Sequence, residues 1–163
     1  MARALARSAR PPGEAWTWIS RLKALAGPTN FAHIGDRIEG FDAALTRGAT
    51  STVVPAAAFD FAAGRAAMAA ALARSRPDGV FCCTDSLAIG ALAALASAGL
   101  RVPADVALVG YDDVAQAAVT VPPLTTVAQP IGAMAERALE LLLGGGPPGT
   151  SLLAPRLVVR ESG

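Results

Sequence analysis

Polar side chains follow several short apolar runs, where they could bind a small molecule. These groups are Thr29-Asn30, Phe59-Asp60, Thr84-Asp85 and Asp112-Asp113. Their carboxylate, amide and hydroxyl groups can donate and accept hydrogen bonds to a polyhydroxylated or nitrogenous ligand, and Phe59 can stack on a flat ligand face. Each acid alone also fits an ordinary role, Asp85 as a helix N-cap and Asp112-Asp113 as a turn.

Signatures of catalysis and of metal or cofactor binding are missing. No GxGxxG motif follows an expected strand, no GxxxxGK[ST] or GxSxG motif is present, and His33 is the only histidine. Cys82 and Cys83 are adjacent rather than in CxxC spacing, so we expect at least one to be buried as a small apolar residue. Asp112-Asp113 could form an acidic Mg²⁺ pair, but no accompanying phosphoryl-transfer residues are found. We therefore expect a protein that is not an enzyme and needs no cofactor and no metal.

Apolar runs alternate with stretches of helical spacing, which predicts a parallel α/β sheet covered by helices. In such sheets ligands bind beyond the carboxyl ends of the strands, which is where the polar groups lie. Asp85 or Ser86 is expected to cap the third helix, and Gly48 and Gly99 to end the first and third helices. The expected strands are 22–26, 52–54, 80–83, 106–109, 124–127 and 156–160, and the expected helices are 34–45, 62–73, 86–99 and 131–143.

Composition excludes several classes of protein. The 163 residues carry a net charge of +1, with 53% hydrophobic and 17% charged residues, which argues against a disordered chain and against a free-standing DNA-binding domain. Residues 1–20 read as a weakly structured leader and not as a secretory signal, and no apolar segment reads as a membrane span. A cytoplasmic protein with one folded unit over 21–163 is therefore expected.

The segment GVFCCTDSLAIGALAALASAGLRVPADVALVGYDDVAQAAVTVPPLTTVAQP resembles the effector-binding domain of the lactose/galactose repressor family of transcription regulators, in its C-terminal half. The resemblance extends back through AGPTNFAHIGDRIEGF and forward through MAERALELLL and RLVVRES. It implies a periplasmic-binding-protein-like fold, in which two α/β lobes enclose a sugar or nucleoside-like effector. It also implies helices on both faces of the sheet, and elements that cross over into the other lobe.

The resemblance assigns roles to individual residues. Arg37 and Asp112 match residues that contact the effector, Phe59 matches a stacking aromatic residue, and Thr84 replaces a usual asparagine. Phe31 and His33 match ligand-contacting loop positions, and Gln129 matches the crossover between lobes. The family's dimer face corresponds to Ile89, Ala93, Val119 and Thr120, for which plain core packing is the alternative.

Only 21 residues precede Leu22, so the family's DNA-binding headpiece and most of its first lobe have no counterpart here. The expected protein is a truncated regulator that binds effector weakly or undetectably and reaches operator DNA only through a headpiece absent from this chain. Helix 131–143 packs into the first lobe in the family, so its apolar face would lack cover. That face contains Ile131, Met134, Ala135, Ala138, Leu141 and Leu142.

Three alternatives stay open. An exported sugar-binding protein shares the fold, although the PPLTT turn and the missing signal peptide argue against it. A second alternative is an interaction protein that dimerises with full-length paralogues and inactivates them. An enzyme of flavodoxin-like architecture is disfavoured by the missing phosphate loops.

Overall fold

The computed structural model describes residues 20–28, 31–45, 48–144 and 149–163. The expected leader, apart from Ser20, and the Thr29-Asn30 group lie outside these residues. In chain order the elements are β1 (Arg21–Ala26), α1 (Ala32–Ala43), β2 (Thr50–Pro55), α2 (Phe61–Arg74), β3 (Gly79–Cys82), α3 (Asp85–Ser97), β4 (Ala107–Val109), the 3-10 helix η1 (Ala115–Ala118), β5 (Thr126–Ala128), α4 (Ile131–Leu143) and β6 (Arg156–Val158).

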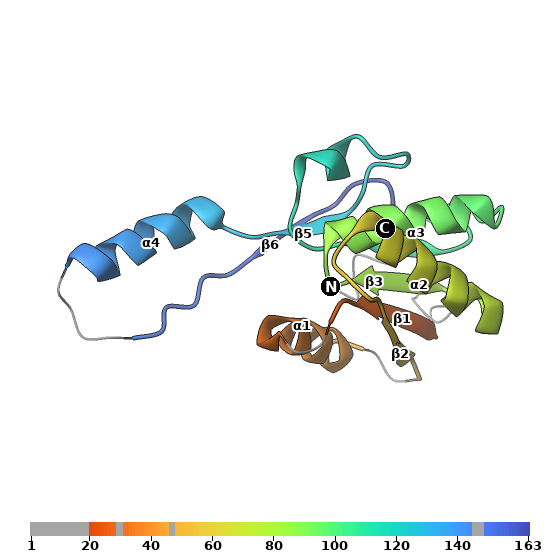
Figure 1. Ribbon diagram of the computed structural model, residues 1–163, viewed down its shortest axis with the longest axis horizontal. Coiled ribbons are helices and arrows are strands. Elements are labelled where there is room, and N and C mark those ends of the chain that lie inside the picture. Colours follow the sequence, from red (N-terminus) through yellow and green to blue (C-terminus); the bar gives the residue numbers. More distant parts are fainter. Residues whose placement is uncertain (1–19, 29–30, 46–47, 145–148) are drawn as a thin grey trace.

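The main sheet has the strand order β2-β1-β3-β4, and all three pairings are parallel. In Figure 1, α1 lies on one side of this sheet, and α2 and α3 lie on the other. Helices cover both faces, and the central strands β1 and β3 are accordingly buried except at Arg21, as strands of parallel sheets usually are. The predicted fold class is therefore confirmed.

Two buried clusters form the core, one on each face of the sheet. Leu25, Val80 and Cys82 pack with the buried sides of α2 and α3. Phe81 and Cys83 point the opposite way and pack with α1, where Phe41 stacks on Phe81 at a ring-centroid distance of 5.1 Å. Both cysteines are buried and free, which confirms the expectation that they act as small apolar residues on alternating faces of the strand.

Glycine permits the close packing of α2 on α3. A Cβ atom on Gly90 would lie 2.7 Å from the backbone nitrogen of Arg65, and one on Gly64 would lie 2.7 Å from the Cα of Leu87. Backbone atoms cannot rotate away as side chains can, so these two positions fix the separation of the helices.

Two predicted helix ends differ from the structure. Thr84, not Asp85 or Ser86, is the N-cap of α3, and its hydroxyl oxygen accepts a hydrogen bond from the Leu87 backbone nitrogen at 3.3 Å. Gly48 does not end the first helix, which stops at Ala43, before the chain reaches Gly48 at φ +88°. Gly99 does follow the end of α3 with φ +71°, a left-handed conformation that suits glycine.

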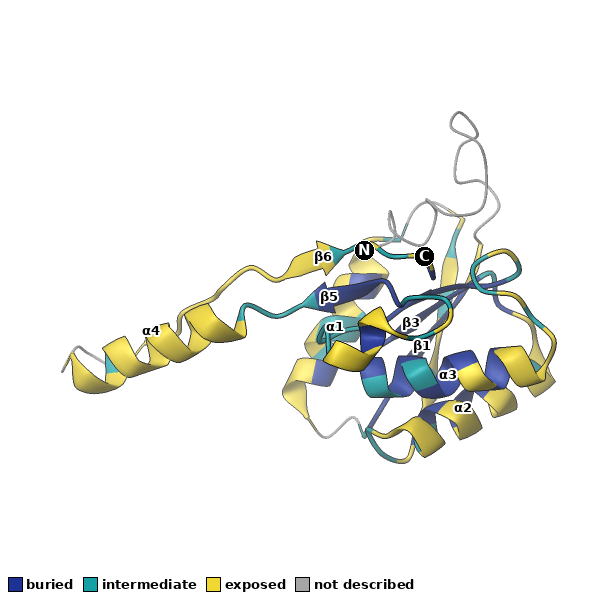
Figure 2. Ribbon diagram, turned by 90° about the horizontal axis from the view of Figure 1, so that it is seen from above, coloured by how far each residue is buried: buried dark blue, intermediate teal, exposed yellow. Residues whose placement is uncertain are grey.

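Beyond β4 the chain crosses to a separate two-stranded sheet, in which β5 and β6 pair antiparallel. Single bridges join Val109 to Thr125 and Asp112 to Ala128, so this ribbon starts at the end of the main sheet. It leads to α4, which has its predicted bounds but no buried residue. In Figures 1 and 2, α4 projects away from the rest of the molecule. No helix in the described part of the chain is long and apolar enough to span a membrane.

Candidate functional site

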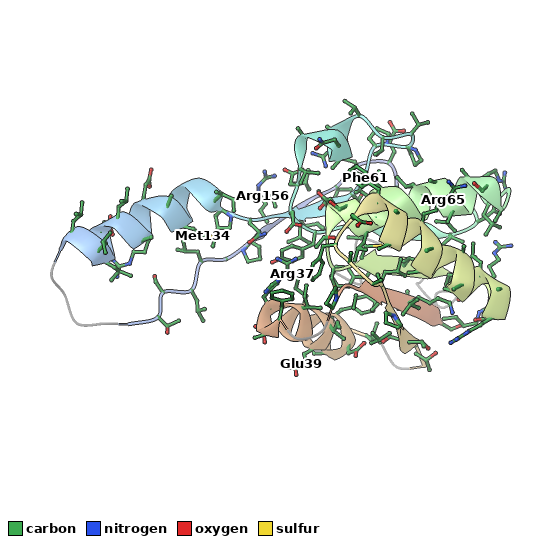
Figure 3. All side chains as sticks on the ribbon, in the orientation of Figure 1. Arg37, Glu39, Phe61, Arg65, Met134 and Arg156 are labelled. Carbon is green, nitrogen blue, oxygen red and sulfur yellow. The ribbon has the colours of Figure 1, made fainter. Side chains whose placement is uncertain are left out.

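Arg37 is the centre of a polar group at the carboxyl ends of the strands. Its guanidinium donates a hydrogen bond to the Cys83 carbonyl oxygen and lies 3.5 Å from the Asp112 carboxylate. The carbon of the guanidinium stands 3.8 Å from the centroid of the Tyr111 ring, a cation–π contact. Figure 3 shows Arg37 extending from α1 toward the crossover region. These contacts hold a long, flexible side chain in one orientation.

Asp112 joins Arg37 to the crossover. Its Oδ1 accepts a hydrogen bond of 2.7 Å from the Gln129 side-chain amide, directly after β5. Burial raises the pKa of the Asp112 carboxyl, while Arg37, the Gln129 amide and His33 oppose that rise. The backbone has φ +122° at Asp112 and +59° at Asp113, and such strain in non-glycine residues is often found at functional sites.

A hollow of about 380 Å³ lies beside this group. Its lining includes His33, Arg37 and Gln129, which were predicted as ligand contacts, and Tyr111 and Asp36, which were not. Tyr111 could have been found as an aromatic residue within the same strand-end tetrapeptide as Asp112. The hollow offers guanidinium, imidazole, phenol, amide and carboxylate groups within a small volume, so it can make several hydrogen bonds to a polar ligand.

The predicted aromatic residues form a second group next to His33. The Phe31 ring meets the Phe59 ring edge-on at 5.6 Å and is tilted against His33 at 5.8 Å. Phe31 is 46% exposed, and Phe59 is half-buried because its ring packs over Gly27. Phe31, rather than Phe59, therefore presents the more open aromatic face at this edge. Neither residue is part of the lining of the 380 Å³ hollow.

Thr84 and Asp85 have structural contacts. Thr84 caps α3 and does not line the hollow. Asp85 is fully buried and accepts hydrogen bonds from the Thr126 hydroxyl at 2.6 Å and from the Val114 backbone nitrogen at 2.9 Å. Burial raises the pKa of Asp85, and these hydrogen bonds oppose the rise. Asp85 therefore connects the start of α3 to the loop after β4 instead of facing a ligand.

Asp113 is also committed to a structural contact. Arg160 donates a hydrogen bond of 2.7 Å to its carboxylate and another of 2.8 Å to the Leu124 carbonyl oxygen. Within the described ranges, no group of three or more His, Cys, Asp or Glu residues could hold a metal ion. Burial raises the pKa of the Cys83 thiol to about 11, so this cysteine stays protonated at neutral pH.

The four predicted dimer residues differ in their exposure. Ala93 is exposed on α3, Val119 is 78% exposed after η1, and Ile89 is partly buried against the core. The Thr120 hydroxyl donates to carbonyl oxygens of its own loop, those of Ala117 and Pro122.

Comparison with known proteins places this geometry in a family. The family model described as a periplasmic binding protein-like domain matches residues 21–163, so the chain belongs to that family. The ribose operon repressor of Haemophilus influenzae is 40% identical over 110 residues, which are 64% of this chain and 33% of the repressor. The HTH-type transcriptional regulator reg1 of Streptomyces lividans is 38% identical over 156 residues, which are 88% of this chain and 45% of the regulator.

A solved dimeric Lac repressor, which carries a C-terminal deletion and a lysine-to-leucine substitution, is 29% identical and superposes with a TM-score of 0.79 over 89% of this chain and 56% of its own. The predicted resemblance to the lactose/galactose repressor family is confirmed by these matches. The relatives are named as regulators, which confirms the prediction that the chain is not an enzyme. The chain spans less than half of the length of the ribose operon repressor and of reg1.

Proposed function

We propose that this chain is the second lobe of a cytoplasmic transcription regulator, and that it forms one wall of a site for an uncharged polar effector of the sugar or nucleoside class. The observation that carries the proposal is the contact of Asp112 with both Arg37 and Gln129 beside a hollow at the strand ends. Parallel α/β sheets bind their ligands at this edge.

The charges at the site favour a neutral ligand. Arg37 is the one arginine among the described residues that line the hollow, and its charge already faces Asp112. An anionic ligand would have to compete with that carboxylate. A hydroxyl group can instead donate to Asp112 and accept from Arg37 or Gln129 without breaking their contact.

The effector contacts of this wall are proposed to be Arg37, Asp112, Gln129 and His33, with Phe31 and Phe59 as an apolar edge and Thr84 as a weaker hydroxyl contact. The complementary wall would come from a first lobe, to which α4 is proposed to belong. Closure of the two lobes on effector would then shift the regulator between conformations. Operator DNA would be bound through a headpiece outside this chain.

Titration by two-dimensional NMR tests the effector site, because it detects weak binding and reports its position. Ribose and adenosine are expected to perturb the Gln129 side-chain amide and the Arg37 signals, whereas glucose 6-phosphate is expected to bind more weakly. Asp112→Asn removes a charge-assisted acceptor worth about 1.5–3 kcal/mol, so it should weaken binding about tenfold or more. Asp113→Asn is the matched control. Perturbations confined to other surfaces would contradict the proposal.

A dimer of the kind found in the Lac repressor structure is proposed through Ala93 and Val119, the exposed members of the predicted face. The partner is a second copy or a full-length paralogue. Ala93→Glu would place a carboxylate in this interface, and it should lower the association constant measured by sedimentation velocity. Unchanged association would contradict this interface.

A further inference from the structure

The Asp85 side chain is a hydrogen-bond acceptor at the centre of the turn after β4. Its Oδ2 accepts a hydrogen bond of 2.9 Å from the Val114 backbone nitrogen, and its Oδ1 accepts one of 2.6 Å from the Thr126 hydroxyl. The Asp85 backbone nitrogen donates a hydrogen bond of 2.7 Å to the Tyr111 carbonyl oxygen. Asp85 therefore contacts the residue before the turn Asp112-Asp113, the residue after it, and β5.

The turn needs such contacts because its backbone is strained. The φ angles are +122° at Asp112 and +59° at Asp113, in a region that residues other than glycine rarely adopt. Such conformations persist only where the surrounding structure holds them in place. Because Tyr111 and Val114 are both bound to Asp85, the two ends of the turn are fixed, and the residues between them have few alternative conformations.

Gly110 makes room for the Asp85 carboxylate beside the turn. A Cβ atom on Gly110 would overlap Oδ1 of Asp85, the atom nearest to it. The φ angle of Gly110 is not positive, so a side chain is excluded here by the close approach of the carboxylate and not by the backbone conformation. The end of β4 is therefore shaped to receive the Asp85 carboxylate.

Asp112 is the site residue whose direction depends on this turn. Its Oδ1 accepts a hydrogen bond of 2.7 Å from the Gln129 side-chain amide and lies 3.5 Å from the Arg37 guanidinium. Hydrogen bonds weaken steeply when their angle falls below about 120°, and a binding site needs its groups held within about 0.5 Å. A loosened turn would therefore weaken the contacts of Asp112 although the residue itself is unchanged.

We propose that Asp85 is a positioning residue for the effector site, because its carboxylate holds the turn after β4 in the conformation in which Asp112 meets Arg37 and Gln129. This role rests on the proposed function, since it concerns the same site. Asp85 does not line the hollow, so it acts through Asp112 and not by touching the effector. The positioning has a local consequence in the ligand-free chain and a second one for effector affinity.

Two-dimensional NMR of the full 163-residue chain tests both consequences. In the ligand-free chain, Asp85→Ala should move the Gln129 side-chain amide signals toward their positions in Asp112→Asn. In titrations with ribose and adenosine, Asp85→Ala should weaken binding about tenfold or more, as expected for Asp112→Asn. Gly110→Ala displaces the Asp85 carboxylate while every hydrogen-bonding group stays in the chain, and it should change both readouts in the same direction.

Two further variants separate positioning from a general loss of stability. Asp85→Asn keeps an oxygen that can accept from the Val114 nitrogen, and its amide can donate to the Thr126 hydroxyl. It should restore the Gln129 signals and bring the affinity to within about threefold of the unsubstituted chain. Gly90→Ala disturbs the contact of α3 with α2, so it should lower stability and leave both readouts unchanged.

Unchanged Gln129 signals and unchanged affinity in Asp85→Ala would overturn the proposal. An equal loss of affinity in Gly90→Ala, or no recovery in Asp85→Asn, would also overturn it. If the unsubstituted chain binds neither ribose nor adenosine, the proposed function fails, and the Gln129 signals of the ligand-free variants still decide whether Asp85 positions Asp112.

Discussion

Asp85→Ala offers a sharp test of how the strand-end loops are held together. In this variant two donors lose their hydrogen-bond acceptor. They are the hydroxyl of Thr126, a fully buried residue, and the Val114 backbone nitrogen. Leaving a buried donor without an acceptor costs about 1–3 kcal/mol for each group. Part of this loss is offset because a buried carboxylate, whose pKa is raised by burial, no longer has to be desolvated. We expect a net loss of about 2–4 kcal/mol in the free energy of unfolding.

Urea unfolding at pH 7 measures this loss. With a urea dependence of about 2 kcal/mol per M, the middle of the usual range for small proteins, the midpoint should fall by roughly 1–2 M. Asp60→Ala is the matched control, because Asp60 is exposed and its carboxylate accepts one hydrogen bond, of 2.7 Å, from the Ala63 backbone nitrogen as the cap of α2. Loss of such a cap costs about 1 kcal/mol.

A double-mutant cycle with Thr126→Val separates the hydrogen bond from other effects of Asp85→Ala. Because the two side chains bond each other, their effects should be non-additive, with a coupling of about 0.5–3 kcal/mol. The reasoning is refuted if Asp85→Ala destabilises no more than Asp60→Ala does, or if the two substitutions of the cycle are additive.

Three further predictions concern packing, thiol chemistry and pH. Gly90→Ala should destabilise the protein by about 1–3 kcal/mol in thermal unfolding, because its Cβ would meet the α2 backbone; Gly40→Ala, in open space on α1, should be neutral or stabilising by up to about 1 kcal/mol. Cys82 and Cys83 should resist a thiol reagent in native protein at pH 8 and react in urea, because burial raises the pKa of both thiols, that of Cys83 to about 11; rapid labelling of the native protein would contradict this. Hydrogen bonds from Arg101 lower the pKa of Asp105 to about 2. The stabilisation by the Asp105 carboxylate should therefore be present above about pH 4 and lost as the pH falls toward 2. Asp105→Asn should therefore make the free energy of unfolding fall less steeply as the pH is lowered from 4 to 2. An unchanged pH dependence would argue against the ion pair.

Much of the fold could be predicted because its signals are local. The strands β3 and β4 are short apolar runs, and α4 begins and ends where helical spacing and the following glycine indicate. The cap of α3 could not be fixed in this way, because Thr84, Asp85 and Ser86 are all good capping residues. The choice among them depends on Thr126 and Val114, which are distant in sequence and bind Asp85.

The contacts within the site could not be predicted for the same reason, because they join residues that are distant in the sequence. The meeting of Arg37 with Asp112 was expected only from the family resemblance, since the two are 75 positions apart and no periodicity connects them. Tyr111 was missed because its role depends on which side of the strand end faces α1. The antiparallel pairing of β5 with β6 was also not predicted, because each is a three-residue strand and their contact crosses the whole of α4.

The adjacent acids after β4 have a mechanical consequence. Asp112 binds Gln129, which follows β5, and Asp113 binds Arg160, which lies just beyond β6. The ends of β5 and β6 are thus both hydrogen-bonded to the turn Asp112-Asp113. The positive φ angles of these two residues leave the backbone of the turn little freedom to adjust. Rotation of α4, β5 and β6 relative to the main sheet would strain both hydrogen bonds at once. The turn can therefore convert a movement of the distant helix into a displacement of the Asp112 carboxylate beside Arg37.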